Sequence, residues 1–170
     1  DALALLAALR VAGRDARLWM PGAREAGREA YIAELEADAV RLGVADALAM
    51  TPPTAAIADA YAASDLVLQV SRKPESFGRT VIEALSVGRP VLGWAHGGVG
   101  ELLDALFPAG AAAPFDADAL HRAAVALLDA GASVTMPAWP LPQALAAMQA
   151  ATLACYDALL SPSTTDADTR

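Results

Sequence analysis

Two glutamates, Glu75 and Glu83, stand eight positions apart in the chain, with Gly78 between them. A carboxylate accepts charge-assisted hydrogen bonds from hydroxyl groups. A helical pattern begins at Gly78, and the first amides of that helix, those of Gly78, Arg79 and Thr80, have no partner within it and can bind an anion. Two carboxylates beside such amides suit a ligand that carries both hydroxyls and phosphates, as a nucleotide sugar does.

The helix that contains Glu83 has one polar face. Arg79, Glu83 and Ser86 follow i, i+4, i+7 spacing, so they share a face that we expect to look toward the ends of neighbouring strands. An ordinary alternative is an exposed Arg79–Glu83 ion pair worth about 0.2–0.5 kcal/mol, with Glu75 as a solvated loop residue. The lead-in PESFG at residues 74–78 and the strand pattern on each side of the helix favour a binding site.

Helical and strand-like patterns alternate along the chain. We predict helices over residues 1–12, 25–42, 55–63, 78–87, 100–106 and 116–130, and strands over residues 16–20, 47–50, 65–70, 90–94 and 111–114. A turn at residues 137–142 then precedes a C-terminal helix.

This alternation predicts a Rossmann-like α/β domain, a doubly wound parallel sheet flanked by helices, whose ligands bind beyond the carboxyl ends of the strands. Because the first element is a helix, we expect one more strand before residue 1. We assign residues 1–160 to this domain and residues 161–170 to a disordered tail.

The composition argues against several classes of function. The net charge of −8 disfavours nucleic-acid binding, which needs a basic surface. Cys155 is the only cysteine and the chain has two histidines, so we expect no disulfide and no metal site, and a reducing cytoplasm fits. Residues 141–160 approach the length of a membrane span, but polar residues such as Gln149 and Asp157 interrupt them. Residues 141–160 therefore indicate an amphipathic helix that packs against the rest of the domain.

Four segments of the chain resemble one known family. PESFG at residues 74–78, VIEA at 81–84, GRPV at 88–91 and the glycine pair at 97–98 are similar to the retaining glycosyltransferases of the "glycosyl transferases group 1" family. That family has the GT-B fold and an E-x7-E pattern, which Glu75 and Glu83 match. The resemblance is to the C-terminal, donor-binding domain and covers roughly residues 1–130.

The resemblance implies a role for each matching residue. Glu75 would contact the transferred sugar as the catalytic electrostatic and positioning group, and Glu83 would bind the ribose hydroxyls. Residues around the start of the motif helix would hold the phosphates and nucleoside, the turn after the second predicted strand would pack the base, and the histidine and glycines after the fourth would border the cleft. These further binding residues are Met50, Thr51, Ser76, Phe77, Gly78, Arg79, Thr80, His96, Gly97 and Gly98.

The resemblance also implies the reaction and the partners. A sugar would pass from a UDP-, GDP- or ADP-linked donor to a glycan, lipid or small-molecule acceptor, as in polysaccharide biosynthesis, with retained configuration and no essential metal or cofactor. The acceptor-binding N-terminal domain, and the Arg and Lys that the family places after its first strand, are not in this sequence. We therefore expect the chain alone to be inactive, and a cytoplasmic protein that meets the inner membrane face only through the absent half.

Two alternatives stay open. The first is a non-catalytic nucleotide-sugar-binding or scaffold module of the same fold. The second is a GT-B epimerase or phosphorylase, which the spacing of Glu75 and Glu83 makes less favoured than a transferase.

Other residues have simpler expected roles. Arg72 and Lys73 either add positive potential near the motif or form a solvated loop pair. The tryptophans are expected in packing, Cys155 as a small buried hydrophobe and His121 on the surface; the tryptophans are Trp19, Trp94 and Trp139.

Overall fold

A computed structural model describes residues 1–138 and 145–160 of the chain. The chain divides into two compact units, Asp1–Pro137 and Ala138–Arg170. Trp139, most of the turn predicted at 137–142 and the tail predicted at 161–170 lie outside the described residues.

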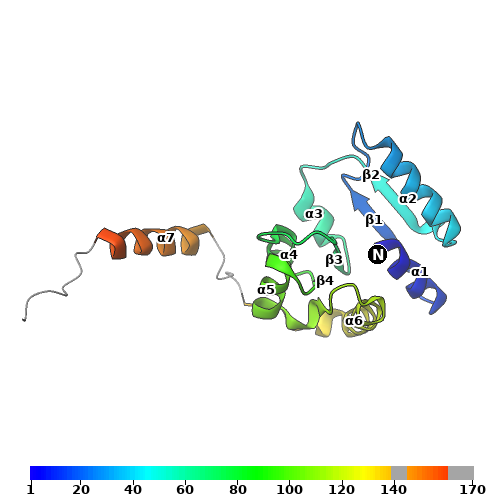
Figure 1. The fold of residues 1–170 in the computed structure, drawn as a ribbon. Helices are drawn as coiled ribbons and strands as arrows, with labels where there is room; N and C mark the ends of the chain where they lie inside the picture. Colours follow the sequence, from blue (N-terminus) through cyan, green and yellow to red (C-terminus); the bar gives the residue numbers. More distant parts are fainter. Residues whose placement is uncertain (139–144, 161–170) are drawn as a thin grey trace, which may run out of the picture. The chain divides into compact units, whose positions relative to one another are not determined.

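The first unit alternates helices and parallel strands (Figure 1). Its helices are α1 (Ala2–Val11), α2 (Glu29–Arg41), α3 (Ile57–Ala62), α4 (Arg79–Ser86), α5 (Gly97–Leu106) and α6 (Ala117–Ala130), with short 3-10 turns η1 (Ala45–Ala47), η2 (Pro108–Gly110) and η3 (Gly131–Ser133). Its strands are β1 (Leu18–Pro21), β2 (Leu48–Thr51), β3 (Val67–Gln69), β4 (Val91–Trp94) and β5 (Ala111–Ala112).

The strands form two parallel sheets. β1 pairs with β2, with Leu18 opposite Leu48. β3 pairs with β4, with Val67 opposite Val91, and β4 pairs with β5. The predicted α/β architecture with parallel strands and covering helices is confirmed, whereas the prediction of one continuous sheet is not met within the described residues.

The predicted elements are all present in this unit, with shifted ends. The two largest differences are at α2, which begins at Glu29 and not at residue 25, and at α5, which begins at Gly97 and not at Gly100. We predicted a loop there because glycine weakens helices, but packing against the preceding motif loop, described below, requires glycine in this first turn. At α6 the prediction is accurate, since the Asp116 carboxylate accepts a hydrogen bond from the Ala119 amide at 2.9 Å and caps the helix.

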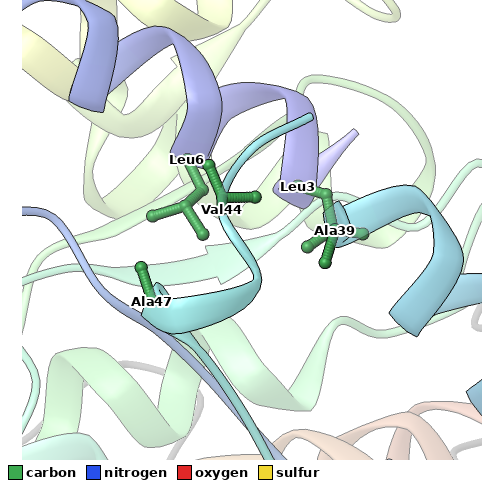
Figure 2. Packing of buried hydrophobic residues seen from close by; sticks show 5 residues of the cluster. All are labelled: Leu3, Leu6, Ala39, Val44 and Ala47. Atoms are coloured by element: carbon green, nitrogen blue, oxygen red, sulfur yellow. The ribbon is translucent and has the colours of Figure 1, made fainter. Parts of the chain in front are cut away.

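One hydrophobic cluster holds α1 against the first strand pair. Leu3 of α1 lies next to Ala39 of α2 and Leu6 next to Val44, and Ala47 belongs to the same cluster (Figure 2). Each of these side chains is buried. Leu3 and Leu6 therefore form the core contact of α1.

The second part of the core surrounds β4, whose four residues are all buried. Leu92 and Trp94 are among its largest fully buried side chains, and Leu103 of α5 is buried as deeply. In β1, by contrast, Trp19 is 43% exposed, and its indole NH donates a hydrogen bond to the Thr51 hydroxyl at the strand end. Trp94 thus has the expected packing role, whereas the Trp19 side chain is only partly covered by the described residues.

A cavity of about 1870 Å³ lies between the two sheets. It is lined by both β1 and β3, by α1 and by residues at the end of α6. Ordinary ligand pockets have about 300–1,000 Å³, and adjacent strands of a sheet lie about 4.7–4.9 Å apart. Among the described residues β1 pairs only with β2 and β3 only with β4, so the edges that face the cavity have no partner strand there. The space between these edges is larger than a small-molecule pocket.

The second unit contains α7 (Leu145–Leu160). Its large apolar side chains are exposed; they are Met148, Leu153, Tyr156, Leu159 and Leu160. Cys155 is exposed as well, so its predicted burial is wrong. Alanine and larger apolar residues surround this helix on every side, so it has no single stripe to bury. No helix among the described residues has the length and apolarity needed to cross a bilayer.

His121 on α6 is only partly on the surface. Its ring nitrogen Nε2 is buried and has no hydrogen-bond partner among the described residues. The prediction of a surface histidine is therefore wrong for this end of the ring.

Candidate functional site

The motif loop runs from the end of β3 at Gln69 to Gly78, the residue before α4. Gly78 has a left-handed backbone with φ of 78°, which glycine adopts at little cost. A Cβ at this position would also stand 3.1 Å from Val99 Cα. Glycine therefore suits this position in two ways, because of the left-handed turn into α4 and because α5 approaches closely.

The glycine pair at the start of α5 packs against the motif loop. The Gly98 amide donates a 2.7 Å hydrogen bond to the Glu75 carbonyl. A Cβ on Gly97 would lie 2.8 Å from that carbonyl oxygen, and one on Gly98 would lie 2.7 Å from the Ser76 carbonyl. The pair thus sets the path of the loop that carries Glu75.

The Glu75 side chain is half-buried and held by Gln69. The Gln69 Nε2 donates a 2.6 Å hydrogen bond to Glu75 Oε1. The Gln69 Oε1 accepts one from the Ser71 amide at 3.2 Å. Glu75 is therefore an anchored residue, and the alternative of a solvated loop carboxylate does not describe it.

Glu83 has two partners on its carboxylate. Arg79 Nη2 donates to Oε1 at 2.7 Å, four residues apart on α4. The Tyr61 hydroxyl, from α3, donates to Oε2 at 3.2 Å. Burial of the ring, and then the negative charge of Glu83, raise the pKa of Tyr61 above its usual value near 10. The Arg79–Glu83 ion pair of the alternative interpretation is present. Glu83 also accepts a hydrogen bond from Tyr61, so three side chains make the contact.

His96 holds the back of the motif loop. It precedes α5, and its carbonyl accepts a 3.1 Å hydrogen bond from the Gly100 amide. Its Nε2 lies 3.1 Å from the Ser71 carbonyl. Its ring meets Phe115 edge-on at 5.3 Å between centroids. The protein contacts of His96 are therefore those of a residue that joins two loops.

Arg72 is exposed but paired. Its guanidinium makes two hydrogen bonds to the Asp1 carboxylate, at 2.9 and 2.7 Å. It also lies over the Phe115 ring, 5.4 Å from the centroid. Phe115 has a positive φ of 65°, a conformation that is rare for a bulky residue. The Arg72 side chain is thus 68% exposed, as the solvated-pair alternative expects, but its charge is paired with that of Asp1.

The remaining predicted site residues are spread over both sheets. Ser76 and Phe77 are exposed in the motif loop. Met50 and Thr51 end β2 in the other sheet, and their backbone oxygens accept hydrogen bonds from Arg24. The structure brings residues 75–83 and 96–98 together, while residues 50 and 51 stand at the end of a separate strand pair.

The cavity reaches this site from one side. Tyr61, Gln69 and Thr80 line it, and two of these side chains are the hydrogen-bond partners of the glutamates. The carboxylates of Glu75 and Glu83 lie outside its lining. No group of three or more His, Cys, Asp or Glu side chains among the described residues is arranged to hold a metal ion.

Sequence reasoning missed three residues of the site: Tyr61, Gln69 and Phe115. Gln69 is polar at the end of an otherwise apolar strand, and this was the available signal. The Tyr61 contact joins two helices and the Phe115 contact joins two loops, and neither spacing within the chain nor residue type indicates them.

A comparison with known protein families decides the relationship. The family model of the glycosyl transferases group 1 matches residues 2–130. The chain belongs to this family. The matched range is that of the resemblance seen in the sequence, and it contains every residue of the candidate site.

Solved structures resemble the chain in fold. HepE from Anabaena, in complex with UDP and glucose, is 25% identical over 76% of this chain and 34% of its own, with a TM-score of 0.62. WaaG, a glycosyltransferase involved in lipopolysaccharide biosynthesis, is 25% identical over 75% of this chain and 33% of its own, with a TM-score of 0.63. Sucrose-phosphate synthase from Thermosynechococcus elongatus is 22% identical over 94% of this chain and 43% of its own, with a TM-score of 0.67.

These matches confirm the predicted fold class of this group 1 chain, an α/β domain of the GT-B type. The chain spans about a third of the length of HepE and of WaaG. No curated protein matches the sequence.

Proposed function

We propose that this chain is the donor-binding domain of a retaining glycosyltransferase. The protein would transfer a sugar from a nucleotide-diphosphate sugar to a glycan, lipid or small-molecule acceptor. One observation carries the proposal: Glu75 is held just before the amino end of α4 by two hydrogen bonds, one from Gln69 to its carboxylate and one from the Gly98 amide to its backbone carbonyl.

The amino end of α4 supports a diphosphate site. In the described part of the chain, the amides of Gly78, Arg79 and Thr80 donate no hydrogen bond to the protein. Such amides and the helix dipole favour an anion. The Arg79 side chain is 81% exposed and adds positive charge nearby. A diphosphate at this position would accept hydrogen bonds from the three neutral amides and would lie near the positive charge of Arg79.

Glu75 and Glu83 would then bind the two ends of the ligand. Only Oε1 of Glu75 is hydrogen bonded to a side chain in the described residues, so Oε2 is available to a sugar hydroxyl or to positive charge that develops on the ring. Glu83 would bind ribose hydroxyls by exchanging one of its partners, Arg79 or Tyr61. These are the roles that the E-x7-E pattern implies.

The transfer step is a displacement at the sugar C1. The bond from C1 to the diphosphate oxygen breaks, and the acceptor hydroxyl oxygen bonds to C1 from the same face. The acceptor proton passes to the departing phosphate oxygen. Charge develops on both sides of the breaking bond, and groups fixed in advance at those positions lower the barrier. Glu75 would act on the sugar, and the α4 amides on the diphosphate.

UDP-sugars are the first donors to test, because HepE was solved with UDP and glucose. The protein in its full length is heated with UDP-, GDP- and ADP-sugars, since a ligand that binds only the folded state raises the melting temperature. The stabilising donor is then incubated with acceptor candidates, and the product's anomeric configuration is read by NMR.

We expect a retained configuration, and loss of transfer in Glu75→Ala with the nucleoside diphosphate still bound. Binding without transfer would support the non-catalytic module instead. An inverted product would contradict retention, and no stabilisation by any donor would contradict the site itself.

A further inference from the structure

Gln69 is the last residue of β3, and its backbone is closely held. It stands opposite Gly93 in the parallel register. A Cβ at Gly93 would lie 2.6 Å from the Gln69 carbonyl oxygen, so only glycine lets β4 come this near. The start of the Gln69 side chain is therefore fixed by the sheet.

The far end of the Gln69 side chain is fixed as well. A backbone amide can only donate, so the atom that faces the Ser71 amide at 3.2 Å must be the carbonyl oxygen Oε1. This contact settles which end of the side-chain amide is which. The NH2 group is then directed at Glu75 Oε1, 2.6 Å away.

The contact divides the Glu75 carboxylate into two oxygens with different surroundings. Oε1 accepts from Gln69, and a hydrogen bond to a charged group is stronger than one between neutral groups. The Glu75 backbone is tied separately, by the Gly98 amide at 2.7 Å. Hydrogen bonds thus hold both the Glu75 backbone and Oε1. The side chain is therefore restricted to one rotamer, in which Oε2 faces a ligand.

We propose that Gln69 is a positioning residue for Glu75. It selects the rotamer that presents Oε2 to the donor sugar, and it does so without adding charge to the site. The inference rests on the proposed function for the role of Glu75, while the contact itself does not depend on it.

The main test replaces Gln69 with Met, which has a similar length and no donor. Loss of a hydrogen bond to a charged group should lower kcat by roughly 10- to 100-fold. The Kd for UDP should stay within about twofold, because Gln69 does not reach the diphosphate end of the site. The matched control is Gln149→Met, the same change at an exposed position of α7, which should leave kcat and Kd unchanged.

A second variant separates positioning from folding. Gln69→Glu keeps the shape and the acceptor for Ser71, but it places a second carboxylate against Glu75. Two such acids share one proton when the pH falls, so activity relative to wild type should rise between pH 8 and pH 6, while that of Gln69→Met stays flat. His96, Arg72 and Lys73 also affect how activity depends on pH, but every variant keeps them. Dividing each activity by that of wild type at the same pH therefore removes their effect.

A direct measurement remains if no transfer is found. The two side-chain amide protons of Gln69 should give widely separated NMR signals in the wild type, because only one of them faces a carboxylate, and Glu75→Ala should bring them together. Unchanged signals in Glu75→Ala would overturn the proposal. So would a kcat of Gln69→Met within twofold of wild type, or an equal loss of UDP binding and stability, which would indicate a merely structural role.

Discussion

The loop that carries Glu75 and the helix that carries Glu83 hold their carboxylates by different means. Glu75 depends on partners brought from β3 and from α5, Gln69 and the Gly98 amide. Glu83 has Arg79 one helical turn away on its own helix, and Tyr61 on the adjacent α3. The position of Glu75 is therefore set by tertiary packing, and that of Glu83 largely by helix geometry. Changes that disturb packing should separate the two.

The largest effect is expected from Gly98→Ala. The added Cβ would stand 2.7 Å from backbone atoms of Ser76, which cannot rotate away, so α5 and the motif loop must part. Overpacking of this kind costs about 1–3 kcal/mol. We expect that loss in the free energy of unfolding measured in urea, together with weaker UDP binding.

Gly43→Ala is the control for this variant. Gly43 has a φ of 69° and nothing within 4 Å of a Cβ, so Ala there should cost about 1 kcal/mol of backbone strain and leave UDP binding intact. If both variants bound UDP equally well, the glycine pair would not set the position of the Glu75 loop.

A smaller effect is expected from Tyr61→Phe, which removes the second partner of Glu83. The lost hydrogen bond should cost about 0.5–1.5 kcal/mol near neutral pH. Burial and the charge of Glu83 raise the pKa of Tyr61, so the folded state holds this proton more tightly than the unfolded chain. The stabilisation is present below pH 10 and is lost as the pH rises above it.

Urea unfolding from pH 8 to pH 11 measures this slope. Tyr61→Phe should show a shallower alkaline loss of stability than wild type, and Tyr31→Phe, at a tyrosine of α2 that is 46% exposed, controls for removal of a phenol. Equal slopes in wild type and Tyr61→Phe would show that the contact with Glu83 is not maintained in solution.

The smallest effect is expected from Arg79→Ala. The Arg79–Glu83 pair is exposed on the arginine side, at 81% against 32% for Glu83, and such pairs contribute about 0.2–0.5 kcal/mol. At 1 M salt the Debye length is about 3 Å, so the difference from wild type should vanish there. Arg41→Ala, which breaks a comparable pair with Asp38 on α2, should lose as little stability. Only Arg79→Ala should also weaken UDP binding.

The same comparison explains what the sequence could predict. Helix periodicity predicted α4 and placed Arg79 and Glu83 on one face, because residues four apart on a helix are neighbours. Local rules also predicted the capped start of α6 at Asp116. The family resemblance located both glutamates and the range of the matching domain.

Contacts between distant elements were beyond those rules. Gln69 reaches Glu75 only because the motif loop folds back on β3, and α5 tolerates two glycines only because the loop lies against them. Trp19 was expected in packing from its type, and its side chain is 43% exposed in the described part of the chain. In each case a neighbour far along the chain decides the outcome, and periodicity contains no information about that neighbour.

The inner edges of β1 and β3 have a practical consequence. Residues 18–21 and 67–69 each present a row of peptide groups to the cavity between them, and such rows readily recruit any extended polypeptide that meets them. Produced as these 170 residues, the chain would be prone to self-association through added strands, and low concentration or a soluble fusion partner would be needed to keep it monomeric.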